Sequence, residues 1–251
     1  MTFETLFRNC AYGKYEECGD HVNYLFKADG RTLYIYFQGS RGDVDWRRNF
    51  SFWKKPYKDM KKVYRVHAGF AKAWKEVADI VIAKITEKAE DGTYKWDKII
   101  TVGYSHGGAL AAFCQECVWY HRPDIKENCW GIGFEAPRIY AGLHFRKELR
   151  ARWKNFRVIR NQQDIVTHVP PFLFGFKHVG EIVKIGGRPH LLAALWNCFK
   201  ALLHKDKNAA KQYALEFVQV TPHYSSKVIA SLQEFDASEE GRSLATEIGI
   251  N

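Results

Sequence analysis

The 251-residue sequence predicts an α/β fold with a mostly parallel central sheet and helices on both faces of that sheet. Two observations lead to this prediction. Short apolar segments rich in β-branched and aromatic residues alternate with longer segments in which apolar residues recur every three or four positions. In addition, no Pro/Ser-rich linker, low-complexity run or internal repeat divides the chain, so we expect residues 1–251 to form a single domain.

The expected strands are short, apolar and bounded by turn residues. They span residues 33–37, 63–66, 98–102, 129–134, 156–160 and 181–185. The first of them ends in Gln-Gly-Ser-Arg-Gly, which is typical of a loop.

The expected helices alternate with these strands. They span residues 71–90, about 108–120, 190–204 and 226–235. In the first, Trp74, Val77 and Val81 repeat with a helical period, and Asp91-Gly92 is a stop signal. The helix at 190–204 has a broad apolar face, which more often packs in a core than anchors a protein to a membrane.

The segment Gly103-Tyr-Ser-His-Gly107 lies between an expected strand and an expected helix. A strand, a tight turn and a helix in this order form a nucleophile elbow, which raises a serine hydroxyl above the edge of a sheet. Glycines flank the serine because the turn is strained and the helix passes close to the strand. Ser105 is therefore the candidate nucleophile.

A serine hydroxyl needs an imidazole to accept its proton and a carboxylate to orient that imidazole. Asp164 directly follows the strand at 156–160 and is favoured over Asp206, which lies in a Lys-rich stretch. The histidines after Asp164 are His168, His178, His190, His204 and His223. His223 is favoured as the base because it lies in a late loop before the last helix, although spacing alone leaves this choice open.

An oxyanion hole needs two N–H groups, one after the nucleophile and one from an earlier loop at a strand end. The backbone of His106 supplies the first, and we expect its side chain to point away from the serine hydroxyl. Ser40, in the loop after the first strand, is the candidate for the second.

The formal net charge of +10 is consistent with contact to an anionic lipid surface or an acidic ligand, and equally with a solvated surface. No nucleic-acid motif accompanies this charge, so nucleic-acid binding is not expected. Cys114 and Cys117 form a lone C-x-x-C without a second pair at zinc spacing, so we expect core packing and neither metal nor cofactor. The sequence shows no signal peptide and no run of eighteen apolar residues, which predicts a cytoplasmic protein with free thiols; secretion by a non-classical route is the alternative.

Five ordered blocks resemble the class 3 (fungal-lipase-like) triacylglycerol lipases, a family of the α/β-hydrolase fold. The blocks are Phe37-Gln-Gly-Ser40, Val66-His-Ala-Gly-Phe70, Gly103-Tyr-Ser-His-Gly-Gly-Ala109, Phe134-Glu-Ala-Pro-Arg138, and Asn161-Gln-Gln-Asp164 with the following Val169-Pro-Pro171 and His178-Val-Gly180. The fourth parallels the family's Phe-Gly-x-Pro-Arg. Gln38 replaces an arginine of the usual pattern, and Tyr104 and His106 replace the His and Leu around the serine.

The resemblance implies that Ser105 is the nucleophile, Asp164 the orienting acid and His223 the base. It also implies an oxyanion hole at Ser40 and His106, and a structural role for His178. Residues at about 43–54 take the place of the family's lid, which would gate access to the site. The aromatic residues of this segment would cover an apolar cleft, meet a lipid surface or pack permanently in the core; they are Trp46, Phe50, Phe52 and Trp53.

The expected activity is hydrolysis of carboxylic esters, lipid esters above all, through an acyl-enzyme intermediate and without a cofactor. One alternative is an acyltransferase or thioesterase that uses the same groups. The other is a catalytically inactive protein that binds anionic lipids. The sequence does not indicate an oligomeric state.

Overall fold

The computed structural model describes residues 1–19, 22–39, 54–57, 64–141, 150–162, 164, 166–170, 172–186 and 225–250. The strands are β1 (Glu16–Cys18), β2 (Val22–Asp29), β3 (Thr32–Phe37), β4 (Lys54–Tyr57), β5 (Tyr64–His67), β6 (Lys98–Tyr104), β7 (Cys129–Phe134), β8 (Tyr140–Ala141), β9 (Phe156–Asn161), β10 (Phe176–Lys177) and β11 (Glu181–Ile185). The α-helices are α1 (Phe3–Tyr12), α3 (Ala68–Ile85), α4 (His106–His121), α8 (Ser225–Ala237) and α9 (Glu239–Ile248). Short 3-10 helices are η1 (Pro123–Asn128), η2 (Val166–His168) and η3 (Phe172–Phe174).

The large sheet has the strand order β1-β2-β3-β6-β7-β9-β11 among the described residues. From β3 to β11 every neighbouring pair is parallel, and β1 and β2 form an antiparallel edge. The expectation of a mostly parallel sheet is therefore confirmed. Because the carboxyl ends of parallel strands lie at one edge, residues that follow β3, β6, β7 and β9 are brought together there.

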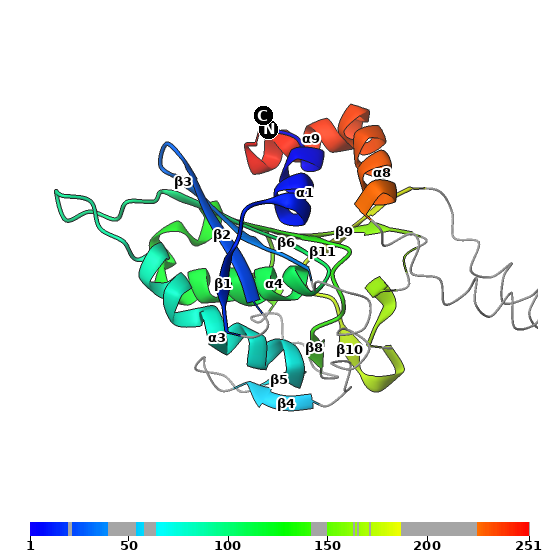
Figure 1. The fold of residues 1–251 in the computed structure, drawn as a ribbon, viewed down its shortest axis with the longest axis horizontal. Helices are drawn as coiled ribbons and strands as arrows, with labels where there is room; N and C mark the ends of the chain where they lie inside the picture. Colours follow the sequence, from blue (N-terminus) through cyan, green and yellow to red (C-terminus); the bar gives the residue numbers. More distant parts are fainter. Residues whose placement is uncertain are drawn as a thin grey trace, which may run out of the picture.

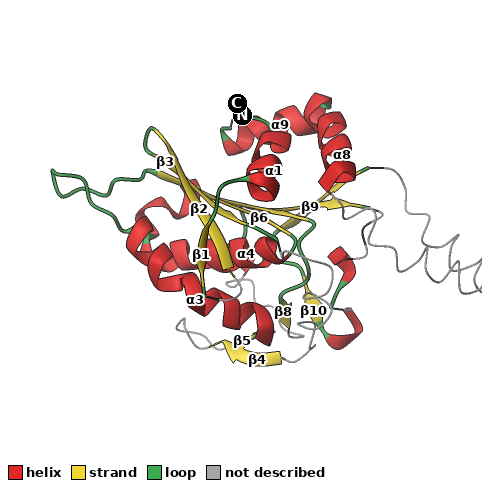
Figure 2. Cartoon of the chain, viewed as in Figure 1, coloured by secondary structure: helices red, strands yellow, loops and turns green. Residues whose placement is uncertain are grey.

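Helices cover both faces of this sheet, with α3 and α4 on one side and α1, α8 and α9 on the other (Figures 1 and 2). The central strands β3, β6 and β7 are buried on both faces along nearly their whole length, as parallel strands between two helical layers require. On β6, Ile99 belongs to the core beneath α3 and α4, whereas the next residue, Ile100, belongs to the core beneath α1 and α8. Successive side chains of one strand thus fill two separate hydrophobic cores.

Several predicted elements need correction. The helix expected over 71–90 ends at Ile85, and the chain then turns back so that Lys88 pairs with Tyr94. The strand expected at 63–66 is β5, which belongs to a separate antiparallel sheet of order β10-β8-β5-β4. The helix predicted at 190–204 lies outside the described residues.

The two ends of the chain meet on one face of the sheet (Figure 1). The N–H groups of Phe3 and Glu4 donate to the two carboxylate oxygens of Asp236 on α8, at 2.9 and 3.0 Å. A carboxylate at a helix N-terminus satisfies free N–H groups and complements the helix dipole. No local pattern in the sequence predicted α1, α9 or the strands β1, β2, β4, β8 and β10.

The C-x-x-C cysteines pack as predicted, since Cys114 and Cys117 of α4 are buried in the core under α3. The cysteines of the described residues are all free thiols. None of the described helices is both long enough and apolar enough to span a bilayer.

Candidate active site

Ser105 occupies the turn between β6 and α4 in a strained conformation, with φ 54° and ψ −120°. A positive φ outside glycine costs about 1–3 kcal/mol and persists only where the surroundings enforce it. Here the N–H of Ser105 donates to the carbonyl of Phe134 at 2.8 Å, and its carbonyl accepts from the N–H of Gly108 at 2.9 Å. The turn is therefore fixed by β7 on one side and α4 on the other, and the predicted elbow is confirmed as local structure.

The flanking glycines are required by close backbone contacts. A Cβ added at Gly103 would lie 2.0 Å from the carbonyl oxygen of Gly107, and one added at Gly107 would lie 2.1 Å from that of Phe37. No side chain fits at either position, so α4 can start directly against the ends of β3 and β6.

In the loop after β3, the residue that lies against the candidate nucleophile is Gly39, which directly precedes Ser40. A Cβ added at Gly39 would lie 3.4 Å from the Cβ of Ser105 and 3.2 Å from the carbonyl oxygen of Tyr104. Ser40 itself lies outside the described residues. His106 is the first residue of α4, so its N–H lies at the positive end of the helix dipole, a position that favours an anion.

Neutral hydrogen bonds hold the base of this loop where the family has an arginine. The side-chain amide of Asn23 donates to Oε1 of Gln38 at 2.9 Å, and the backbone N–H of Gln38 donates to the carbonyl of Asn23 at 3.0 Å. The Gln38 amide donates in turn to the carbonyl of Ala11 at 3.4 Å. Gln38 therefore attaches the loop to β2 and α1.

Asp164 follows β9 and is fully buried. Its N–H donates to the carbonyl of Asn161 at 3.0 Å, and its Oδ1 accepts from the N–H of Val166 at 2.8 Å. This closed turn fixes the carboxyl at the edge of the sheet that also carries Ser105. The geometry suits an acid that orients a histidine.

Glu135, for which the sequence analysis suggested no role, lies between the nucleophile and the acid in the order of strands. It follows β7, is fully buried, and has a φ of 49°. Its Oε1 accepts from the N–H of Asn161 at 2.8 Å. Burial and the adjacent Asp164 carboxyl raise the pKa of Glu135 well above its ordinary value. The available signal was the glutamate itself, which replaces a glycine of the family pattern.

Two of the five candidate histidines are described, and both contact backbone carbonyls. Nδ1 of His168 lies 3.1 Å from the carbonyl oxygen of Asp164, and Nε2 of His178 lies 2.7 Å from that of Thr167. Burial lowers the pKa of His168 and lowers that of His178 to about 4. These contacts suit structural roles. The other three, with Asp206, lie outside the described residues: His190, His204 and His223.

The aromatic residues of the candidate lid, Trp46, Phe50, Phe52 and Trp53, also lie outside the described residues, and the described chain resumes at Lys54. Among the side chains that the structure describes, no three His, Cys, Asp or Glu residues gather as metal ligands.

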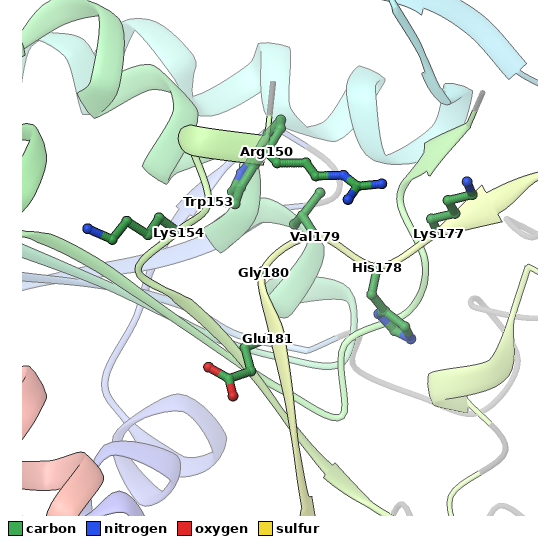
Figure 3. A pocket seen from close by; sticks show the side chains of 8 residues that line it. All are labelled: Arg150, Trp153, Lys154, Lys177, His178, Val179, Gly180 and Glu181. Carbon is green, nitrogen blue, oxygen red and sulfur yellow. The ribbon is translucent and has the colours of Figure 1, made fainter. Parts of the chain in front are cut away.

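A cavity of about 340 Å³ lies away from the elbow. Figure 3 shows its lining, which consists of Arg150, Trp153, Lys154, Lys177, His178, Val179, Gly180 and Glu181. Glu181 is the first residue of β11, whereas Ser105 follows the last residue of β6. Because β6 and β11 run in the same direction, the cavity lies toward the opposite edge of the sheet from the candidate nucleophile.

The model of the family described as lipase (class 3) matches residues 34–174, more than half of the chain. A lipase of Rhizomucor miehei is 26% identical over 151 residues, which is 60% of this chain and 41% of the relative. A secreted mono- and diacylglycerol lipase of Fusarium solani is 27% identical over 160 residues, 63% of this chain and 45% of the relative. The chain thus spans less than half the length of these relatives.

Solved structures agree with the sequence comparison. The structure of Rhizomucor miehei triacylglyceride lipase superposes with a TM-score of 0.58 at 26% identity, and the match covers 68% of this chain and 66% of that one. The α/β-hydrolase fold expected from the sequence is therefore confirmed.

The comparison contradicts the predicted cytoplasmic localisation, because the Fusarium solani relative is named as a secreted protein. The prediction depended on the lack of a signal-peptide pattern in a chain that covers only 45% of that relative. The lack of a signal-peptide pattern in this sequence is therefore no guide to where the protein acts.

Proposed function

Because this chain belongs to the class 3 lipase family, we propose that it is a serine carboxylic ester hydrolase with Ser105, Asp164 and His223 as its catalytic triad. The observation that carries the proposal is the strained turn at Ser105, held against β7, with the buried Asp164 carboxyl at the same edge of the sheet. Strain of this kind concentrates at functional sites. The order Ser, Asp, His along the chain is that of the α/β-hydrolase triad.

In this proposal His223 accepts the proton of the Ser105 hydroxyl as Oγ attacks the ester carbonyl. The N–H groups of His106 and Ser40 stabilise the negative charge that develops on the carbonyl oxygen. His223 then gives its proton to the leaving alcohol, and an acyl group remains on Ser105. Water, activated by the same histidine, hydrolyses the acyl-enzyme, while Asp164 orients and stabilises the imidazolium in both steps.

We further propose that the substrates are acylglycerols at a lipid surface and that the protein acts outside the cell, as the names of the relatives suggest. Leu173 and Phe174 on η3 support a lipid surface, because they are 93% and 52% exposed. A cation lies beside this apolar turn, since Nζ of Lys54 would be 3.5 Å from a Cβ at Gly175. Apolar side chains next to a cation suit an anionic lipid surface.

The candidate lid at about 43–54 ends beside this turn, because Lys54 begins β4. We propose that residues 1–251 form one domain. We also propose that the lid and η3 contact the lipid together. Exposed apolar side chains next to a segment that gates the site would couple lipid contact to opening.

The test of the proposed function is hydrolysis of p-nitrophenyl butyrate at pH 8 by the wild type and by Ser105→Ala. We expect the variant to lose about 10³-fold or more in kcat, since the nucleophile is gone. Ser226→Ala, at an exposed position on α8, is the matched control and should retain full activity. Equal rates for wild type and Ser105→Ala would refute the proposed nucleophile.

The same assay separates the alternatives. Transfer of the acyl group to an added alcohol, so that a new ester forms instead of the free acid, would indicate an acyltransferase. Faster turnover of a thioester than of the matching oxygen ester would indicate a thioesterase. Binding to anionic vesicles without turnover of soluble or emulsified esters would indicate an inactive lipid-binding protein.

A further inference from the structure

Glu135 shares a buried site with the candidate acid. We propose that Glu135 is a positioning residue whose protonated carboxyl donates a hydrogen bond to the Asp164 carboxylate and fixes its orientation toward the base. The inference rests on the proposed function in so far as Asp164 is the acid of the triad.

The backbone gives the first argument. Glu135 is one of two residues other than glycine with a positive φ among those described, and the other is Ser105. The family pattern has glycine here, which adopts this conformation without strain. A glutamate bears this strain at a fully buried position, so its side chain is expected to contribute an interaction that glycine cannot make.

The hydrogen bonds of the side chain give the second argument. Oε1 of Glu135 accepts from the N–H of Asn161 at 2.8 Å. Oε2 is buried and accepts no N–H or O–H from the described residues, and the polar group beside it is the Asp164 carboxyl. An ionised Oε2 would be a buried acceptor without a donor, which costs several kcal/mol. A protonated Oε2 instead donates to Asp164, so both carboxyls are satisfied.

The local charge gives the third argument. The groups that face Glu135 are Asp164 and the guanidinium of Arg160 on β9. Near Asp164 lie His168 on η2, whose pKa is lowered by burial, and Arg138, which follows β7 and donates to the carbonyl of Pro170. Among the described residues, Arg160 is the cation that acts on Glu135, and two adjacent buried carboxylates that were both ionised would repel each other strongly. Burial and the Asp164 carboxyl also raise the pKa of Glu135, a direction that favours its protonated form.

Protonation of Glu135 has a consequence for catalysis. While Glu135 is neutral, its O–H holds one oxygen of Asp164 and leaves the other for the imidazole. When Glu135 ionises at alkaline pH, two adjacent buried carboxylates repel each other, and Asp164 loses this orientation. Turnover should then decline on the alkaline side with the ionisation of Glu135.

The first measurement needs no turnover. The infrared spectrum of the wild type at pH 7 should contain the C=O band of a buried protonated carboxyl, which Glu135→Gln removes and Asp164→Asn shifts. A wild-type spectrum without this band, or a band that Asp164→Asn leaves in place, would overturn the proposal. Because the band is independent of activity, it decides the contact even if Ser105→Ala shows that the proposed triad is wrong.

The second measurement is the pH profile of kcat. Glu135→Gln keeps a donor and should turn over like the wild type at pH 7 without the alkaline decline. Glu135→Met keeps length and backbone strain but has no donor, so its kcat should fall about 10- to 100-fold with little change in KM. Glu135→Gly relieves the backbone strain and should show the same fall in kcat as Glu135→Met. It replaces the Met variant in the test if that variant does not fold. A Met and a Gly variant with wild-type kcat would refute the positioning role.

Discussion

Gly107 lies against the end of β3, since a Cβ added to it would be 2.1 Å from the carbonyl oxygen of Phe37. This contact joins the first turn of the helix after the nucleophile to the strand that leads into the candidate oxyanion loop. This one close contact between backbones therefore sets the relative positions of the two N–H groups of the proposed oxyanion hole.

We expect Gly107→Ala to impair both folding and catalysis. The added methyl group must displace α4 or β3, at a cost of about 3 kcal/mol in the free energy of unfolding, and kcat should fall with it. Gly30→Ala is the control, because Gly30 has a φ of 54° but nothing within 4 Å of an added Cβ. It should lose only about 1–2 kcal/mol and keep its kcat. Urea unfolding and esterase assays on both variants check this, and equal behaviour of the two would contradict the close-contact argument.

Asp164→Asn should separate the effect of the negative charge of Asp164 on catalysis from its role in holding the turn. The amide oxygen can still accept from the N–H of Val166, so the melting temperature should change little. Without its negative charge the side chain no longer stabilises an imidazolium, and kcat should fall roughly 10³- to 10⁴-fold. Asp97→Asn, at an exposed ion pair with Arg31, is the control and should leave kcat unchanged. A near-normal kcat for Asp164→Asn would mean that another carboxylate orients the base.

The exposed pair on η3 should matter for lipid surfaces and not for soluble esters. Replacement of both Leu173 and Phe174 by Ser removes apolar surface worth about 1–2 kcal/mol per side chain at an interface. We expect about a tenfold or greater loss of binding to phosphatidylglycerol vesicles, measured by sedimentation, with unchanged hydrolysis of p-nitrophenyl butyrate. Ile80→Ser, at a 36% exposed position on α3, is the control. Unaltered vesicle binding by the double variant would place the lipid contact elsewhere.

Acid should destabilise the fold through His178. Burial lowers its pKa from 6.5 to about 4, so the unfolded chain binds a proton that the folded chain does not. Its stabilising contribution is complete above pH 6.5 and is lost as the pH falls from 6.5 to about 4, at up to about 1.4 kcal/mol per pH unit. His178→Gln should flatten this dependence in urea titrations at pH 7.5 and 4.5, whereas the exposed His121→Gln should not. An equal slope in wild type and His178→Gln would assign the acid sensitivity to other groups.

The elements that the sequence predicted well are those whose signals are local. The run at 98–102 is short and rich in β-branched residues, and the glycines at 103 and 107 stand at fixed offsets from Ser105. β6, the turn and α4 could therefore be predicted from a short window. Elements that depend on distant partners were missed or misplaced. The N-terminus of α1 is capped by Asp236, more than 230 residues away, and β5 joins a second sheet through its partners β4 and β8.

The sequence alone determined the fold class, the nucleophile and the acid as candidates, because period, turn chemistry and motif spacing act over a few residues. Only the tertiary structure decided that Glu135 lies beside Asp164, that Gly39 reaches Ser105, and that His168 and His178 contact backbone carbonyls. These relationships arise because neighbouring parallel strands bring residues far apart in the chain to one sheet edge. Burial there sets which groups can carry charge, which no local pattern encodes.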